Sequence, residues 1–417
     1  MAPSPTFVIV GAGLAGARAA QTLREEGFDG RVILLGEEPE RPYERPPLSK
    51  GLLLGATPRH DVYVHDAGWY DQFDVDLRTA TRVTAVDRAA RHVVLDNGEQ
   101  VRYDKLLLTT GSTPRRLAAP GADLDGVLYL RTLAQSDRIA ETLTRPARLV
   151  VVGAGWIGLE IAAAARRHGA GVTVVDIADL PLQRVLGDEV ARVFADLHRS
   201  HGVTFRFGVG IRELRGAGRV SSVVLTDGTE LAADTVVVGV GVQPDTQLAE
   251  AAGLKVDNGI VTDAQLLTSD PHIYAAGDVA STYHPLLNRH IRVEHWANAL
   301  NGGPAAARSM LGREIEYARL PYFFSDQYDL GMEYSGWVAP GGYDRVVFRG
   351  DPTVVDGRAP EFLAFWVSDG RILAGMNANV WDVTDPIQAL VRAGHGGRAV
   401  DLAKLADPGV PLGDLLA

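Results

Sequence analysis

The sequence has 417 residues, enough for two or three domains with separate hydrophobic cores, which argues against a single small binding module. Its formal charge of -11 argues against general nucleic-acid binding, and no apolar run approaches the roughly 20 residues that a membrane helix needs. Cysteine is absent, so disulfide exchange, thiolate catalysis and thiolate-bound iron–sulfur clusters are excluded within this chain, and redox chemistry needs a bound organic cofactor.

The first predicted elements form a strand, a glycine turn and a helix. Residues 7–10 are strand-like and no signal-peptide pattern precedes them, so we expect a cytoplasmic protein. The turn is Gly11-Ala12-Gly13-Leu14-Ala15-Gly16, and Ala-rich residues 17–23 have helical character. In such a turn the first glycine allows the bend, the second lets backbone approach a pyrophosphate, and the third lets the helix pack on the strand.

The same pattern returns in the middle of the chain. Residues 149–152 lead into Gly153-Ala154-Gly155-Trp156-Ile157-Gly158 and a second Ala-rich helix. Each turn is followed by another strand and an acid, Glu37 or Asp176, placed to accept hydrogen bonds from ribose hydroxyls. Either turn alone is compatible with a simple strand-to-helix bend. Finding the complete pattern twice predicts two dinucleotides, or one dinucleotide and a flavin dinucleotide, and the lack of an Arg beside Asp176 favours NADH over NADPH.

Later segments complete the predicted architecture. Residues 106–114 and 235–244 are two similar buried strands that close into glycine turns, as if one unit were used twice. Residues 273–276 form an apolar strand that delivers Gly277 and Asp278, where Asp278 is either a polyol ligand or a plain helix N-cap. Beyond residue 320, alternating segments such as 345–350 and 362–367 indicate antiparallel strands.

The predicted fold class is α/β, with two Rossmann-like dinucleotide-binding domains of the glutathione-reductase type and a C-terminal α+β domain. We predict a discontinuous FAD-binding domain at 1–111 and 243–321, an NADH-binding domain at 112–242, and a C-terminal reductase domain at 322–417.

The whole pattern resembles the FAD-dependent NADH:ferredoxin reductases that serve cytochromes P450 and ring-hydroxylating dioxygenases, the group of putidaredoxin reductase and biphenyl dioxygenase reductase. The more specific marks are the runs at 45–50 (RPPLSK), 155–160 (GWIGLE), 276–278 (AGD) and 293–299 (VEHWANA). One departure is that many relatives place Gln after Asn-Ala and one further residue, whereas this chain reads Asn298-Ala299-Leu300-Asn301-Gly302-Gly303. Gly302 and Gly303 are expected to weaken the helix beside the flavin.

The resemblance and the glycine turns together imply two sets of cofactor-binding residues and no metal site. The expected FAD contacts are Gly11, Gly13, Leu14, Ala15, Gly16, Glu37, Arg45, Lys50, Val83, Thr110, Gly111, Arg131, Gly277, Asp278 and Trp296. The expected NADH contacts are Gly153, Gly155, Trp156, Ile157, Gly158, Glu160, Asp176, Arg184 and Gly241.

Lys50 and Glu160 are the residues to which we assign catalytic roles. A lysine near the flavin stabilises the negative charge that reduction leaves on the ring, and Glu160 is placed to pair with Lys50 and hold it. An ordinary solvated helix residue is the alternative for Glu160, and a plain core residue is the alternative for Trp296.

The expected activity is hydride transfer from NADH to FAD, followed by single-electron transfer to an iron–sulfur ferredoxin that feeds a P450 or Rieske-type oxygenase. An acidic ferredoxin would need a local basic surface, for which the candidates are Arg289, Arg292, Arg308 and Arg313. Two alternatives stay open: an NADH oxidase, and a flavin-holding NADH sensor resembling apoptosis-inducing factor.

Overall fold

The computed structural model describes residues 4–143 and 147–416. Its internal contacts divide the chain into two compact units. The first unit comprises Met1–Glu44, Arg59–Thr113 and Gln243–Pro321, and the second comprises Arg45–Pro58, Pro114–Val242 and Tyr322–Ala417. The short segment 45–58 is thus grouped with the second unit, although we assigned it to the first domain by chain order. The division into three domains stays a prediction.

A five-stranded parallel sheet forms the centre of the first unit. Its strand order is β19-β7-β1-β2-β3. The strands are β1 (Thr6–Val10), β2 (Arg31–Leu35), β3 (Val75–Arg78), β7 (Lys105–Leu108) and β19 (Ile273–Ala275). Residues 7–10 of β1 are buried because both faces of the sheet are covered, which is why this strand reads as a continuous apolar run.

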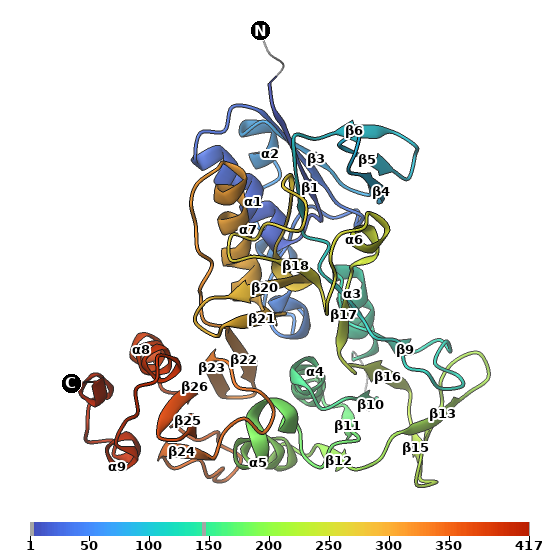
Figure 1. Ribbon diagram of the computed structural model, residues 1–417. Helices are drawn as coiled ribbons and strands as arrows, with labels where there is room; N and C mark the ends of the chain where they lie inside the picture. The colour runs from blue at the N-terminus through green and yellow to red at the C-terminus, as the bar shows by residue number, and fades with distance from the viewer. Residues whose placement is uncertain (1–3, 144–146, 417) are drawn as a thin grey trace. The chain divides into compact units, whose positions relative to one another are not determined.

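Alternate residues of β1 enter two different cores. Val8 and Val10 pack with residues of the small antiparallel sheet β4 (Val83–Asp87), β5 (His92–Leu95) and β6 (Gln100–Arg102). Phe7 and Ile9 point to the other face and pack with α1 (Leu14–Glu25) and α7 (Trp296–Met310). Figure 1 shows these two helices side by side.

The helix that Gly302 and Gly303 were expected to weaken is continuous over Trp296–Met310. A Cβ atom on Gly303 would lie 2.1 Å from the carbonyl oxygen of Ala15 in α1. Glycine is therefore required at residue 303 for the close approach of the two helices, and their packing outweighs the low helix propensity of glycine.

Shorter elements complete the first unit. They are α2 (Trp69–Gln72), α6 (Gln247–Ala251), β18 (Ile260–Thr262), β20 (Ala280–His284), β21 (Arg289–Arg292) and the 3-10 turn η3 (Gly277–Val279). The strands β8 (Ser112–Pro114) and β17 (Val242–Pro244) pair with each other where the chain passes between the units.

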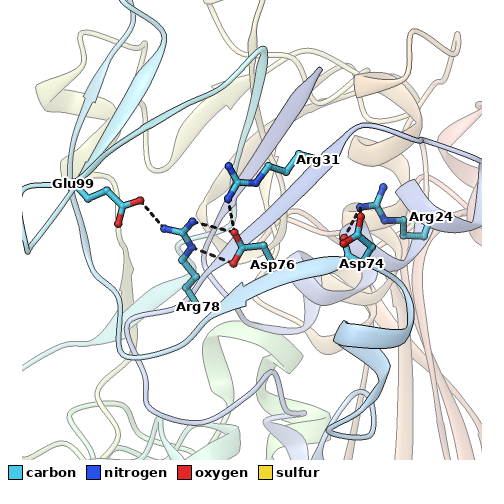
Figure 2. A network of polar contacts seen from close by, with 6 residues as sticks. All are labelled: Arg24, Arg31, Asp74, Asp76, Arg78 and Glu99. Atoms are coloured by element: carbon cyan, nitrogen blue, oxygen red, sulfur yellow. Dashed lines mark hydrogen bonds and ion pairs between the residues drawn. The ribbon is translucent and has the colours of Figure 1, made fainter. Parts of the chain in front are cut away.

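An ion-pair network at the β2–β3 edge shows how arginines are used in this chain (Figure 2). Asp76 lies 2.8 Å from the Arg31 guanidinium and 3.0 Å from that of Arg78, which also pairs with Glu99 at 2.9 Å. Burial opposes ionisation of Asp76, but the hydrogen bonds from Arg78 and Arg31 outweigh it and lower the pKa of the carboxyl group. These arginines hold the sheet edge, so an arginine in this sequence is not by itself a sign of partner binding.

The second unit repeats the central arrangement of the first. Its parallel sheet has the order β12-β11-β10-β16-β9, with β10 flanked by β11 and β16 as β1 is flanked by β2 and β7. The strands are β9 (Val127–Leu128), β10 (Arg148–Val152), β11 (Gly171–Val175), β12 (Thr204–Arg206) and β16 (Thr235–Val238). The helices are α3 (Leu133–Thr142), α4 (Trp156–Arg167) and α5 (Gln183–Ser200), and a small sheet holds β13 (Ile211–Arg215), β14 (Ser222–Leu225) and β15 (Glu230–Ala232). The prediction that one α/β arrangement occurs twice in the chain is confirmed.

The C-terminal part of this unit is an antiparallel sheet of order β22-β23-β26-β25-β24, as expected from the alternating segments. Its strands are β22 (Tyr322–Gln327), β23 (Leu330–Gly336), β24 (Arg345–Gly350), β25 (Phe362–Ser368) and β26 (Arg371–Ala378), followed by α8 (Thr384–His395) and α9 (Leu402–Ala406). Helix α8 packs along β26 (Figure 1). Among the residues that the structure describes, no helix has the length and apolarity needed to cross a membrane.

Candidate active site

The two glycine turns have the same geometry. Gly11 and Gly153 have φ angles of 112° and 104°, and a Cβ on either would lie 2.2–2.3 Å from the carbonyl oxygen of Thr109 or Gly239. Glycine is therefore required at both positions for the bend.

The other two glycines of each turn differ in the space beside their Cα atoms. A Cβ on Gly16 or Gly158 would lie 2.1 Å from the carbonyl oxygen of the first glycine of its own turn, so the helix packs tightly there. A Cβ on Gly13 or Gly155 would meet no atom within 4 Å. The middle glycine of each turn thus borders open space, as expected where a pyrophosphate approaches the backbone.

Helices α1 and α4 begin directly at these open positions. Gly13 and Gly155 are their N-caps, neither helix has a side-chain cap, and neither carries an acidic residue in its first turn. The N-terminal amide groups of a helix and its dipole favour an anion, so both turns suit a phosphate. The predicted contacts Leu14, Ala15, Trp156 and Ile157 lie in these first turns.

The two acids that follow the second strands are not at equivalent positions. Val10 pairs with Leu35 and Val152 with Val175, so Asp176 corresponds to Gly36 and Glu37 lies one residue further along. A Cβ on Gly36 would lie 2.6 Å from the Cβ of Ala12, so this backbone leaves no room for a side chain at residue 36.

The surroundings of the two carboxylates also differ. Asp176 accepts hydrogen bonds from the backbone amides of Ala154 at 2.6 Å and Ala178 at 2.8 Å, which ties it to the glycine turn. Glu37 is 70% exposed and lies 3.7 Å from the Arg82 guanidinium. A carboxylate has about four acceptor sites, so both acids keep capacity for ribose hydroxyls.

Several other predicted FAD contacts lie in the first unit. Ser112 donates to the carboxylate of Asp278 at 2.9 Å, and Thr110 donates to the carbonyl of Asp245 at 2.7 Å. Gly277 has a φ of 77°, and a Cβ on it would lie 3.2 Å from the methyl group of Ala15 in α1. Gly111 has a φ of 75°, Val83 begins β4 and is buried, and Trp296 is the first residue of α7.

Arg45 and Arg131 lie together in the second unit, where the guanidinium of Arg45 donates to the carbonyl of Arg131. Among the predicted NADH contacts, Gly241 has a φ of 94° and accepts from the amide of Arg115 through its carbonyl, and Arg184 is exposed at the start of α5. The side chain of Trp156 packs edge-on against Phe194.

The segment 45–58 is fixed to two helices of the second unit. Its 3-10 turn η1 covers Pro46–Ser49, and the carbonyl of Leu48 accepts from the hydroxyl of Ser136 in α3 at 2.8 Å. The carbonyl of Leu53 bonds to Nε2 of His168, the residue after α4, at 3.2 Å. The two contacts hold Lys50, which lies between them, close to α4.

Glu160 of α4 is the centre of the most strongly connected buried polar group near Lys50. Its Oε1 lies 2.9 Å from the Lys50 ammonium and accepts from the Ser325 hydroxyl at 2.6 Å, while its Oε2 accepts from the Ser49 hydroxyl at 2.5 Å. Glu160 is 5% exposed and the Lys50 side chain 16%. The expected pairing of Lys50 with Glu160 is present, and Glu160 is a buried ionic residue instead of a solvated one.

Sequence reasoning did not identify Ser49 and Ser325 as partners of Glu160. Ser49 lies inside the run 45–50, but no role was assigned to it. Ser325 is 165 residues from Glu160 and lies in a strand of the C-terminal sheet. No sequence signal connects these positions, because a serine in a strand is unremarkable until the partner it faces is known.

A buried histidine in the same unit gives a pH-dependent stability. Burial lowers the pKa of His198 to about 4, so the ring is neutral in the folded chain, while an unfolded histidine titrates near 6.5. The contribution of His198 to the free energy of unfolding is therefore fully present above about pH 6.5. It is lost as the pH drops toward 4, by on the order of 3 kcal/mol. Urea unfolding between pH 7 and 4 measures the loss, which is expected to shrink in His198→Gln; an equal acid loss in that variant would contradict the assignment.

The four arginines proposed for partner docking lie in the first unit. The side chain of Arg292 is 10% exposed and pairs with Glu294. Arg308 and Arg313 both approach Glu26, at 2.9 and 3.9 Å. Arg289 is exposed on β21. A docking role for this group stays a prediction.

The fold and the paired turns define a class: a two-nucleotide reductase with a C-terminal sheet domain. Comparison with known families agrees. Residues 5–303 match the pyridine nucleotide-disulphide oxidoreductase model and residues 322–416 match the reductase C-terminal model. The chain belongs to the pyridine nucleotide-disulphide oxidoreductase family.

Curated relatives and solved structures are similar over nearly the whole chain. The ferredoxin–NAD(+) reductase component of the anthranilate 1,2-dioxygenase system of Burkholderia cepacia is 43% identical over 410 residues, 97% of this chain and 98% of the relative. Putidaredoxin reductase of Pseudomonas putida is 38% identical over 90% of this chain and 88% of its own. The crystal structure of the covalent putidaredoxin reductase–putidaredoxin complex matches with a TM-score of 0.92 and 35% identity, covering 99% of this chain and 98% of that one. The predicted family resemblance and fold class are confirmed, and the chain is an oxidoreductase with FAD and NADH as cofactors.

Proposed function

We propose that this chain takes a hydride from NADH onto bound FAD and passes single electrons to an iron–sulfur ferredoxin that feeds a P450 or Rieske-type oxygenase. The observation that carries the proposal is the pair of glycine turns with open middle positions in a chain without cysteine. Without a thiol, the chain has no disulfide of its own to reduce, so electrons leave it for another molecule. Two relatives support a ferredoxin as that acceptor: one is a ferredoxin–NAD(+) reductase of a dioxygenase system, and the other is seen joined to putidaredoxin.

The residues present fit both cofactors. We assign the turn at Gly11–Gly16, with Asp278 and Glu37, to FAD, and the turn at Gly153–Gly158, with Asp176, to NADH. FAD supplies the chemistry that no side chain here offers, since it accepts two electrons together and releases them singly. The protein contributes binding, orientation and charge.

Lys50 and Glu160 supply the charge. An ammonium group has three donor hydrogens, so its pairing with Glu160 does not exhaust Lys50. A cation held in a mostly buried site interacts strongly with negative charge because water screens it little there. We therefore assign to Lys50 the stabilisation of reduced flavin, and to Glu160 the placement of Lys50.

The assay that tests the function measures NADH consumption with and without putidaredoxin plus cytochrome c, in air and under argon. The proposal expects turnover that depends on the ferredoxin and persists without oxygen. Turnover that requires oxygen and ignores the ferredoxin would identify an NADH oxidase. Very slow turnover with a persistent charge-transfer band would identify an NADH sensor, and either result would overturn the proposal.

Alanine substitutions at the open glycines separate the two cofactor sites. Neither new methyl group meets protein within 4 Å, so both variants are expected to fold, while the methyl occupies the space that the pyrophosphate needs. Gly13→Ala is expected to lower the FAD content of the purified protein. Gly155→Ala is expected to keep FAD and to raise the dissociation constant of NADH by about tenfold.

Gly68→Ala is the matched control for this pair. Gly68 is also a helix N-cap with an ordinary φ of -77° and open space at its Cβ, but it lies outside both turns. Absorbance at 450 nm measures the bound flavin and titration measures NADH binding. Loss of FAD from Gly155→Ala with retention in Gly13→Ala would reverse the assignment of the two turns.

We also propose NADH as the preferred nucleotide over NADPH. The residue after Asp176 is Ile177, which is 80% exposed and apolar, so the position offers no cation to a 2′-phosphate. The ratio of kcat/KM values for the two nucleotides is expected to favour NADH, and a reversed ratio would refute the choice.

A further inference from the structure

A continuous line of hydrogen-bonded side chains leads away from Glu160 through the interior of the second unit. Ser325 donates to Glu160 Oε1 at 2.6 Å, and Gln327 Nε2 donates to Ser325 Oγ at 3.1 Å. His198 Nε2 lies 2.8 Å from Gln327 Oε1, and the hydroxyl of Tyr328 lies 3.4 Å from His198 Nδ1. Ser325 and His198 are 0% exposed and Gln327 is 1% exposed.

The elements explain how these side chains meet. Ser325 and Gln327 are two residues apart on β22 and therefore point to the same face of the strand. Helix α4 contributes Glu160 to that face and α5 contributes His198. The line therefore joins the strand of the C-terminal sheet to two helices of the nucleotide-binding part of the same unit.

The donors in this line all point toward Glu160. A carboxylate only accepts, so the hydroxyl hydrogen of Ser325 goes to Glu160 and its oxygen accepts from the amide of Gln327. The amide oxygen of Gln327 also only accepts, so Nε2 of His198 carries a hydrogen. In the neutral ring Nδ1 is then an acceptor, which suits the hydroxyl of Tyr328.

Burial maintains this direction. It lowers the pKa of His198 and so keeps a single hydrogen on the ring. The ring of His201 stacks on Tyr328, with the ring centres 3.7 Å apart, and encloses the far end of the line. Because the amide of Gln327 does not exchange its hydrogen readily with its neighbours, the line orients groups and does not conduct protons.

We propose that His198 and Gln327 are positioning residues for the flavin chemistry, acting through Ser325 to fix the carboxylate of Glu160 and hence the ammonium of Lys50. The inference rests on the proposed function, because it assumes that Lys50 serves a bound flavin. A buried polar residue is costly unless it is satisfied, and each link of this line is satisfied by the next. Glu160 therefore accepts from Ser325, whose hydroxyl direction is set by Gln327 and His198, two and three hydrogen bonds from Glu160 along the line.

The test replaces Gln327 with methionine, which keeps the length of the side chain and removes its donor. The flavin midpoint potential is expected to become more negative, by about 30 mV for each tenfold loss in the reduction equilibrium. The stopped-flow rate of flavin reduction is expected to fall about three- to tenfold, with an unchanged dissociation constant for NADH.

Gln388→Met is the matched control. Gln388 also donates to a serine, Ser335, at 3.3 Å in the same unit, and no hydrogen bond among the described residues links that pair to Glu160. Its potential and reduction rate are expected to equal those of the wild type. A control that shifts the potential as much as Gln327→Met would show a general effect of the C-terminal sheet and would overturn the proposal.

A double substitution distinguishes positioning from a merely structural role. In a Lys50→Met background, Gln327→Met is expected to change the potential and the rate no further, because its effect passes through Lys50. Effects that add in full would overturn the proposal.

If Gln327→Met does not fold, two substitutions of His198 replace it. His198→Gln keeps a donor and is expected to have the flavin potential of the wild type, whereas His198→Leu removes the donor and is expected to shift the potential.

The potential measurement also separates this inference from the proposed function. It uses chemical reduction of the bound flavin and needs no ferredoxin. If the wild type turns over without regard to ferredoxin while the variants show the expected potential shifts, the proposed acceptor alone is refuted. If the wild type depends on ferredoxin while the variants keep its flavin potential, the positioning role alone is refuted.

Discussion

Replacing Lys50 with methionine is expected to slow the reduction of bound flavin by NADH by about 100-fold, the usual cost of removing one preorganised donor from developing negative charge. Methionine preserves much of the side-chain volume and removes the cation. The dissociation constant of NADH is expected to change little, because we assign Lys50 to the flavin and not to the nucleotide. Anaerobic stopped-flow absorbance at 450 nm, over a range of NADH concentrations, separates the rate from the binding constant.

Lys255→Met is the control for this substitution. Only four lysines occur in the sequence, and Lys255 is exposed in the first unit, whereas Lys50 lies beside Glu160 and 5.5 Å from the centre of the Phe324 ring. The control removes the same charge from the protein and is expected to leave the rate unchanged. An unchanged rate in Lys50→Met would remove Lys50 from the mechanism.

The sequence predicted the nucleotide turns well because their signal is local. Three glycines within six residues predict the bend, the open position and the tight helix contact, and the structure shows a close backbone contact at the first and third glycines and open space beside the second. The displacement of Glu37 by one residue relative to Asp176 was not predictable from spacing. Only the folded chain shows that residue 36 has no room for a side chain, because a Cβ there would lie 2.6 Å from the methyl group of Ala12.

The partners of Glu160 were not predictable for the opposite reason. They come from residues 111 and 165 positions away, and the line continues to His198 on another helix. Serine, glutamine and histidine in such elements are ordinary in sequence, and only the packing of β22 on α4 and α5 brings them together. The helix containing Gly302 and Gly303 was also misjudged, since propensity ignores the close contact of Gly303 with α1.

Replacing Glu160 with leucine is expected to destabilise the second unit by about 3–5 kcal/mol, because it leaves the Lys50 ammonium mostly buried without its carboxylate. The hydroxyls of Ser49 and Ser325 lose their acceptor in the same step. Urea unfolding followed by tryptophan fluorescence measures the loss as a shift of the transition to lower urea concentration.

The double variant Lys50→Met/Glu160→Leu provides the control, because it removes the whole ion pair and replaces it with apolar side chains. Its stability is expected to exceed that of Glu160→Leu, since no charge is left unpaired in the interior. It is nevertheless expected to reduce flavin as slowly as Lys50→Met, because stability and charge at the flavin depend on different features of the pair. A double variant less stable than Glu160→Leu would mean that solvent, and not Glu160, compensates the charge of Lys50, and the placement of Lys50 by Glu160 would then be wrong.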